Sequence, residues 1–170
     1  MTARTNARVA GAAYFLYLVA GIGSMAAASY PPARDVLRTP SPFCAVALGV
    51  TLYALTRDVD EDLALLGMAL RLLEAAPGNG EIFFAVGNAI FCWLLLRGRL
   101  IPSALAGLGL AWSIFLTALL LLQAGGMFGG RTDWSSPITW FVWLPLLIFE
   151  LAFATWLLTK GVAARARPAA

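Results

Sequence analysis

Long apolar segments follow one another along this chain, and they constrain its fold more than any other feature. The first extends over residues 9–28 and the last over residues 138–159. A helix of about 20 residues spans the hydrocarbon core of a bilayer, which is ~30 Å thick. Hydrophobic residues make up 61% of the sequence and charged residues only 12%, which is too little charge for an ordinary soluble domain. The sequence therefore predicts a polytopic membrane protein.

Six apolar segments predict an all-α bundle of six transmembrane helices, with residues 1–170 forming a single domain. The expected helices cover residues 9–28, 43–56, 59–76, 81–96, 103–124 and 138–159. Turn-forming residues separate them, including the Pro31-Pro32 pair. The first segment resembles a secretory signal, but it is long enough to cross a membrane, so we expect it to be retained as a helix.

The third and fourth segments are the shortest. The apolar part of the third segment, residues 63–76, makes a helix of about 21 Å at the α-helical rise, which is less than the hydrocarbon width. Asp58 and Glu61 have the spacing of a capping box, which would start this helix at residue 59. We expect both segments to span the membrane. The alternative is a re-entrant hairpin whose Pro-Gly-Asn-Gly tip ends inside the protein.

Basic residues favour one orientation of the bundle. If the N-terminus lies inside, the outer segments hold only Arg34, Arg38 and Arg131. The inner segments then hold Arg4, Arg8, Arg57, Arg97, Arg99, Lys160, Arg165 and Arg167. Because cytoplasmic loops are enriched in Lys and Arg, we expect both termini in the cytoplasm.

The complete absence of histidine excludes several kinds of site. It removes the commonest metal and haem ligand and the Ser/His and Cys/His catalytic pairs. Cys44 and Cys92 lie within apolar segments and form no CxxC motif, so we interpret them as packing residues. The basic residues flank apolar segments and form no nucleic-acid-binding motif. We therefore expect no metal, no cofactor, no catalytic residues and no nucleic-acid partner.

Four stretches of the sequence resemble one protein family. They are ARVAGAAYFLYLVAGI, LALLGMALRLLEAA, IFFAVGNAIFCWLLLRGRLIPSALAGLGL and LPLLIFELAFATWLLTKG, in this order. The chain resembles the bacterial membrane proteins grouped as domain of unknown function 4386. This resemblance implies a small multi-helix bundle in the bacterial cytoplasmic membrane, and it implies no activity.

Three ionisable side chains lie inside the apolar segments, where each one is costly and needs a reason. They are Arg71, Glu74 and Glu150. Arg71 and Glu74 are three residues apart, so they are neighbours on one face of the third helix. That face otherwise carries small residues, whereas leucines occupy the opposite face. The pattern predicts a small-residue face that packs against other helices and a leucine face that meets lipid.

Counting 1.5 Å per residue from the inner end of each segment places several polar side chains in one layer. Asn88 and Tyr17 lie at about the depth of Arg71 and Glu150, and Glu74 lies one turn further out. We therefore predict a polar cluster of Arg71, Glu74, Glu150, Asn88 and Tyr17. Three further residues are candidate walls of the same interior site, namely Tyr14, Trp143 and Glu81.

This layer has three interpretations: an internal ion pair that fixes helix order, a pocket for a small solute or lipid head group, and a proton- or ion-coupled site. One guanidinium and two carboxylates leave a formal charge of minus one. Since a buried uncompensated carboxylate is expensive, we expect either Glu150 or Glu74 to be protonated at neutral pH.

Function stays open between three classes. The first is a structural or accessory membrane protein, with the lipid bilayer and another membrane protein as partners. The second is a carrier for a small amphipathic molecule or an ion. The third, an intramembrane enzyme, has the least support because the sequence offers no nucleophile–base pair.

Overall fold

The computed structural model describes residues 1–76, 80–127 and 137–163, and the regular structure of these residues is helical. Their helices are α1 (Ala3–Ala26), α2 (Pro31–Arg38), α3 (Pro40–Thr56), α4 (Glu61–Glu74), α5 (Gly80–Arg97), α6 (Ser103–Ala124) and α7 (Pro137–Thr159). Within this part of the chain, five stretches are long and apolar enough to cross a membrane. They are Ala3–Ala26, Pro31–Thr56, Gly80–Arg97, Ser103–Ala124 and Trp140–Thr159. The chain is therefore a multi-pass membrane protein.

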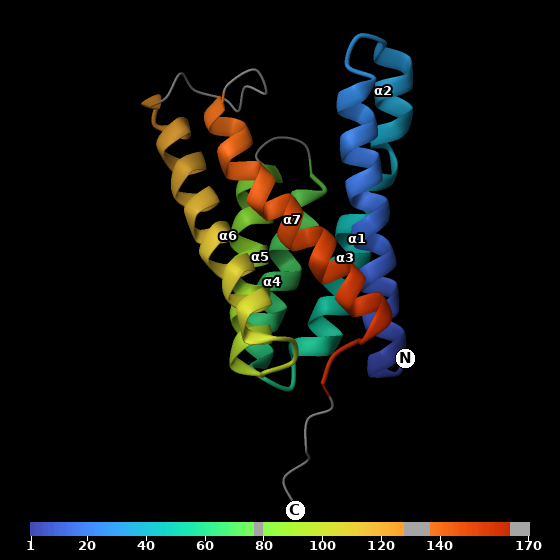
Figure 1. Ribbon diagram of the computed structural model, residues 1–170, viewed down its shortest axis with the longest axis vertical. Helices are drawn as coiled ribbons and strands as arrows, with labels where there is room; N and C mark the ends of the chain where they lie inside the picture. Colours follow the sequence, from blue (N-terminus) through green and yellow to red (C-terminus); the bar gives the residue numbers. More distant parts are fainter. Residues whose placement is uncertain (77–79, 128–136, 164–170) are drawn as a thin grey trace, which may run out of the picture.

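The long helices form a closed ring. Each of α4, α5, α6 and α7 packs against the helix before it, and α3 and α7 both pack against α1. The short α2 packs beside α1. Figure 1 shows that α7 crosses the bundle obliquely and ends close to where α1 begins. The turns from α3 to α4 and from α5 to α6 lie at this same end of the bundle. The interior of the ring is filled by side chains.

The helix α2 was not expected from the sequence, because Pro31 and Pro32 indicated a break. The structure places these two prolines at the start of α2 instead, where a missing N–H costs nothing. Thr39, between α2 and α3, keeps helical backbone angles with φ −52° and ψ −37°. Consequently α3 begins at Pro40 rather than at residue 43, and the two helices form one apolar stretch from Pro31 to Thr56.

The predicted capping box at the start of the third segment is wrong. α4 begins at Glu61, and its N-cap is Asp60, whose carboxylate accepts a hydrogen bond from the Leu63 N–H at 3.2 Å. The second oxygen of Asp60 lies 3.0 Å from Nη1 of Arg97 at the end of α5. Asp60 therefore caps the N-terminus of α4 and ties it to the neighbouring helix.

The two predicted faces of the third segment are confirmed in α4. The small face is buried, with Ala64 fully inaccessible and Gly67 packed against Phe91. A Cβ at Gly67 would lie 3.1 Å from the Phe91 ring, so a glycine permits this approach of α4 to α5. The leucines of the opposite face are exposed on the outside of the ring, namely Leu65, Leu66, Leu72 and Leu73.

Candidate functional site

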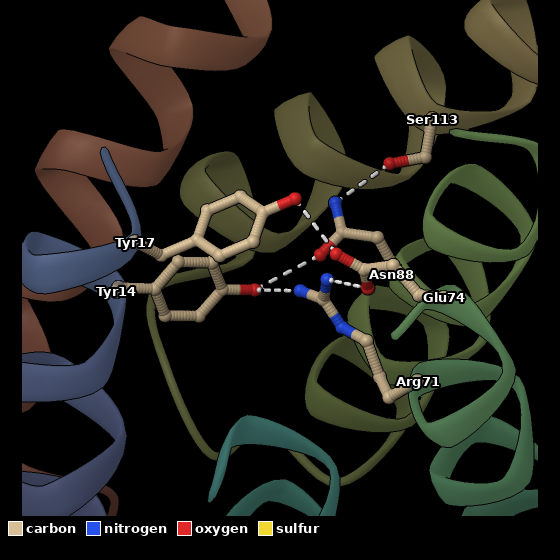
Figure 2. A network of polar contacts seen from close by, with 6 residues as sticks. All are labelled: Tyr14, Tyr17, Arg71, Glu74, Asn88 and Ser113. Carbon is tan, nitrogen blue, oxygen red and sulfur yellow. Dashed lines mark hydrogen bonds and ion pairs between the residues drawn. The ribbon is translucent and has the colours of Figure 1, made fainter. Parts of the chain in front are cut away.

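Arg71 is the centre of a polar network inside the ring. Its side chain is 0% exposed, and its Nη1 lies 2.6 Å from Oε2 of Glu74, one turn along α4. Its Nη2 donates a hydrogen bond to the Tyr14 hydroxyl of α1 at 2.9 Å. Figure 2 shows the guanidinium between the two groups. A buried cation of this kind is stable only when it is paired and hydrogen-bonded.

The two tyrosines of α1 extend this network to other helices. Tyr17 donates a hydrogen bond to Oε1 of Glu74 at 2.7 Å, so both oxygens of that carboxylate have a donor. Tyr14 donates to Oδ1 of Asn88 on α5 at 3.1 Å, and Nδ2 of Asn88 donates to Oγ of Ser113 on α6 at 2.8 Å. We call these six residues the polar network: Tyr14, Tyr17, Arg71, Glu74, Asn88 and Ser113. It joins four helices, α1, α4, α5 and α6.

Aromatic rings surround the guanidinium of Arg71. Its Cζ lies 4.8 Å from the ring centroid of Phe84 and 5.7 Å from that of Tyr14. Phe84 in turn stacks on Trp143 of α7, with 6.1 Å between the centroids. The negative faces of such rings stabilise a cation, most of all where water is excluded. Trp143 thus acts on Arg71 indirectly, by stacking on Phe84.

Glu150 of α7 lies beside the polar network without joining it. Its side chain is buried, and its Oε1 has no hydrogen-bond partner among the described residues. It forms no ion pair within this part of the chain, since Arg71 pairs with Glu74. Arg71 and Glu74 are nevertheless near enough to Glu150 to interact with it electrostatically. Glu150 is therefore a buried acid whose nearest counter-ion is already in use.

The structure joins Arg71, Glu74 and Tyr17 by direct hydrogen bonds. Asn88 is joined to Arg71 through the hydroxyl of Tyr14. Tyr14, predicted only as a wall residue, is bonded to two of the others. Glu81 lies exposed in the first turn of α5 and is not one of the six.

Ser113 was missed by the sequence prediction. It lies at the middle of α6, a helix that is otherwise largely apolar, and it is completely buried. That position is level with the predicted layer by the same residue count, so depth alone was a signal that could have identified it.

The polar network is packed tightly. Arg71, Tyr14 and Ser113 are each 0% exposed, so no space large enough for a water molecule adjoins them. Surface hollows do occur at the end of the bundle where α1 begins, one beside Arg4 and Arg8 and another beside Arg99 and Lys160. Neither is lined by a residue of the network. The arrangement holds a buried ion pair and offers no room beside Arg71 for a ligand.

Residues 78–161 match the family model described as Domain of unknown function (DUF4386). Over these residues the chain is similar to the DUF4386 family. The DUF4386 segment contains α5, α6 and α7, and so it provides Asn88, Ser113 and Glu150. The tyrosines of α1 and the Arg71–Glu74 pair lie before it. No curated protein and no solved structure matches the chain.

Proposed function

We propose that this protein is a structural or accessory bundle of the bacterial cytoplasmic membrane, and that the polar network fixes how its helices pack. Apolar side chains contribute little to helix choice in a bilayer, because lipid tails are as apolar as leucine. Hydrogen bonds and close packing must then decide which helices of the chain pack against one another. The observation that carries the proposal is that Arg71 bonds both to Glu74 and to Tyr14, which joins α4 to α1 with no accessible space beside Arg71.

The outer surface of α6 supports an accessory role. Small residues recur along the first half of one outward face of this helix, namely Ala104, Gly107 and Ala111, and exposed Ile114 and Phe115 follow them on that face. A Cβ at Gly107 would meet nothing within 4 Å. Small residues at such spacing permit a second membrane helix to approach closely. Another membrane protein is therefore the partner class that fits this proposal, alongside the bilayer.

We further propose six spans with both termini in the cytoplasm. The end of the bundle where α1 begins carries Arg4, Arg8, Arg97, Arg99 and Lys160, whereas Arg34 and Arg38 of α2 lie at the other end. This distribution supports the orientation by the positive-inside rule. The exposed leucine face of α4 supports a sixth, short span, because a re-entrant helix is covered by protein rather than by lipid.

The structural role is tested by comparing two arginines that both form ion pairs. Arg71→Met removes the buried partner of Glu74, and we expect a loss of about 3–5 kcal/mol in unfolding free energy. Arg97→Met removes the partner of Asp60 at the surface, where the side chains are 53% and 30% exposed, and we expect a loss of less than about 1 kcal/mol. Unfolding in detergent, followed by circular dichroism, measures both.

A double variant separates packing from a ligand-binding role. Replacing both members of the buried pair, by Arg71→Met with Glu74→Gln, leaves no uncompensated charge at that position, and we expect it to recover a large part of the stability lost in Arg71→Met. Equal stability losses for Arg71→Met and Arg97→Met would refute the structural role.

One observation favours the alternative, a proton- or solute-coupled carrier that uses the same layer. Glu150 is buried without a hydrogen bond at Oε1, and ionisable groups of this kind occur along ion pathways. Liposomes that contain the protein and a trapped pH indicator distinguish the two functions. The structural role predicts equal proton flux for the parent and for Glu150→Gln under an imposed pH gradient. A parent flux that Glu150→Gln abolishes would establish the carrier.

A further inference from the structure

Among the described residues, the interior of the bundle contains one cation and two carboxylates. Arg71 is bound to Glu74, both of whose oxygens accept hydrogen bonds. Glu150 is left over: it is buried, and it forms no ion pair in the part of the chain that the structure describes. A bare carboxylate in such a place is much more costly than a neutral carboxylic acid. A single proton would make the set of three side chains neutral.

We propose that the bundle interior binds one proton, which Glu150 and Glu74 share through their common counter-ion Arg71. The carboxylate that is paired with Arg71 stays ionised, and the other one carries the proton. In the structure Arg71 is paired with Glu74, so the proton is on Glu150. In the second arrangement Arg71 pairs with Glu150, the proton leaves Glu150, and Glu74 takes it up. The number of bound protons is one in both.

The surroundings of Glu150 leave Arg71 as its one available counter-ion among the described residues. The groups near enough to interact with it electrostatically are Arg71 and Glu74 of α4, Tyr14 and Tyr17 of α1, and Cys92 of α5. Of these, Arg71 alone is a cation. The sequences of α6 and α7 contain no titratable side chain besides Glu150 itself. The charge state of Glu150 is therefore set by where Arg71 is bound.

Unused hydrogen-bonding groups are present for the second arrangement. Nε of Arg71 is buried without an acceptor, and Oε1 of Glu150 is buried without a donor. The rings of Phe84 and Tyr14 attract the guanidinium without fixing the direction of its N–H groups. A donor and an acceptor that both lack partners in one interior are complementary, since each buried polar group left unpaired is destabilising.

Infrared spectroscopy of the purified protein in lipid at neutral pH tests the shared proton, because a carboxylic acid and a carboxylate absorb at different frequencies. Uniform ¹³C labelling of glutamate assigns the acid band to glutamate. We expect one buried acid band in the parent and its loss in Glu150→Gln. The decisive variant is Glu74→Gln, which frees Arg71. Glu150 should then pair with Arg71 and lose its proton, so the band should vanish although Glu150 is still present.

A simple buried acid gives a different result. If Glu150 is neutral because of burial alone, its band persists in Glu74→Gln, and this outcome overturns the proposal. So does a parent without any buried acid band. The matched control is Glu61→Gln, which changes an exposed carboxylate and should leave the band intact.

A milder variant covers the case in which Glu74→Gln does not fold. Tyr17→Phe removes the hydroxyl that donates to Oε1 of Glu74, and so weakens the ionised form of Glu74. The shared proton should shift partly toward Glu74, and the Glu150 band should lose intensity while a second acid band appears. An unchanged Glu150 band in Tyr17→Phe contradicts the shared proton. The structural role is tested by unfolding of Arg71→Met and Arg97→Met and not by this band, so its failure would be seen separately.

Discussion

Tyr14 was predicted only as a wall residue of the site, but in the structure it connects several helices. Its hydroxyl accepts from Arg71 of α4 and donates to Asn88 of α5, so one atom joins three helices. Its ring also packs edge-on against Phe153 of α7, with 5.5 Å between the centroids. A phenol at this position therefore serves a polar and an apolar contact at once.

Tyr14→Phe keeps the ring and removes the hydroxyl. Nη2 of Arg71 loses its acceptor and Oδ1 of Asn88 loses its donor, both in a fully buried place. We expect a loss of about 1–3 kcal/mol in unfolding free energy, because unpaired buried polar groups cost about that much. Tyr53→Phe makes the same change at an exposed bond of 3.4 Å to Glu61 and should have little effect. Similar stabilities for the two variants in a detergent denaturation series would contradict this role of Tyr14.

At the scale of the helices, α6 has one glycine that packing requires and one that it does not. A Cβ at Gly109 would lie 2.5 Å from the Phe149 ring of α7 and 2.7 Å from Sγ of Cys92 on α5. A Cβ at Gly107, two residues earlier, would meet nothing within 4 Å. Gly109 thus sets the spacing between α6 and its two neighbours in the ring.

Gly109→Ala should push α6 away from α5 and α7, at a cost of about 1–3 kcal/mol for overpacking a filled interior. Gly107→Ala on the same helix should be neutral or stabilising by up to about 1 kcal/mol, because alanine is the better helix former. Thermal unfolding of both variants in the same detergent gives the comparison. If Gly107→Ala were the more damaging of the two, α6 would face its neighbours in another way.

Periodicity predicted the faces of the helices well and their ends poorly. The leucine and small faces of α4 follow from residue spacing alone, and they are where the spacing puts them. The start of α4 depends on Asp60, whose carboxylate is held by Arg97, a residue that is distant in sequence. The prolines before α3 indicated a break because a proline that starts a helix and one that ends it look the same without the neighbouring structure.

The candidate site was predictable in depth and not in pairing. Counting from the inner ends grouped Arg71, Asn88 and Tyr17, and the structure links them through Tyr14 and Glu74. Whether Arg71 would pair with Glu74 or with Glu150 depends on the rotation of α7 about its axis, which residue counting does not fix. Ser113 was overlooked because a lone serine in an apolar helix carries no charge to mark it.

On the scale of the whole molecule, the ring places α4 in an unusual position. α4 has 14 residues and is therefore about 21 Å long, shorter than the hydrocarbon layer, yet it supplies the only ion pair buried in the described part of the chain. Its leucines form part of the outer surface of the ring. The short helix that holds the central charges packs between two longer helices, α3 and α5.

Cysteine accessibility in cells tests the membrane topology and the span of α4 together. In a protein without Cys44 and Cys92, which are both buried, we introduce Ser29→Cys after α1, Asp58→Cys before α4 and Ala76→Cys after α4, one at a time. With six spans and cytoplasmic termini, a maleimide that does not cross membranes should label positions 29 and 76 in intact cells. It should label position 58 only in inverted vesicles. The cysteine-free protein is the control.

Labelling at 29 but not at 76 in intact cells would mean that α4 and α5 form a re-entrant hairpin. Labelling at 58 alone would mean that the whole bundle has the opposite orientation, and the positive-inside rule would then fail for this chain.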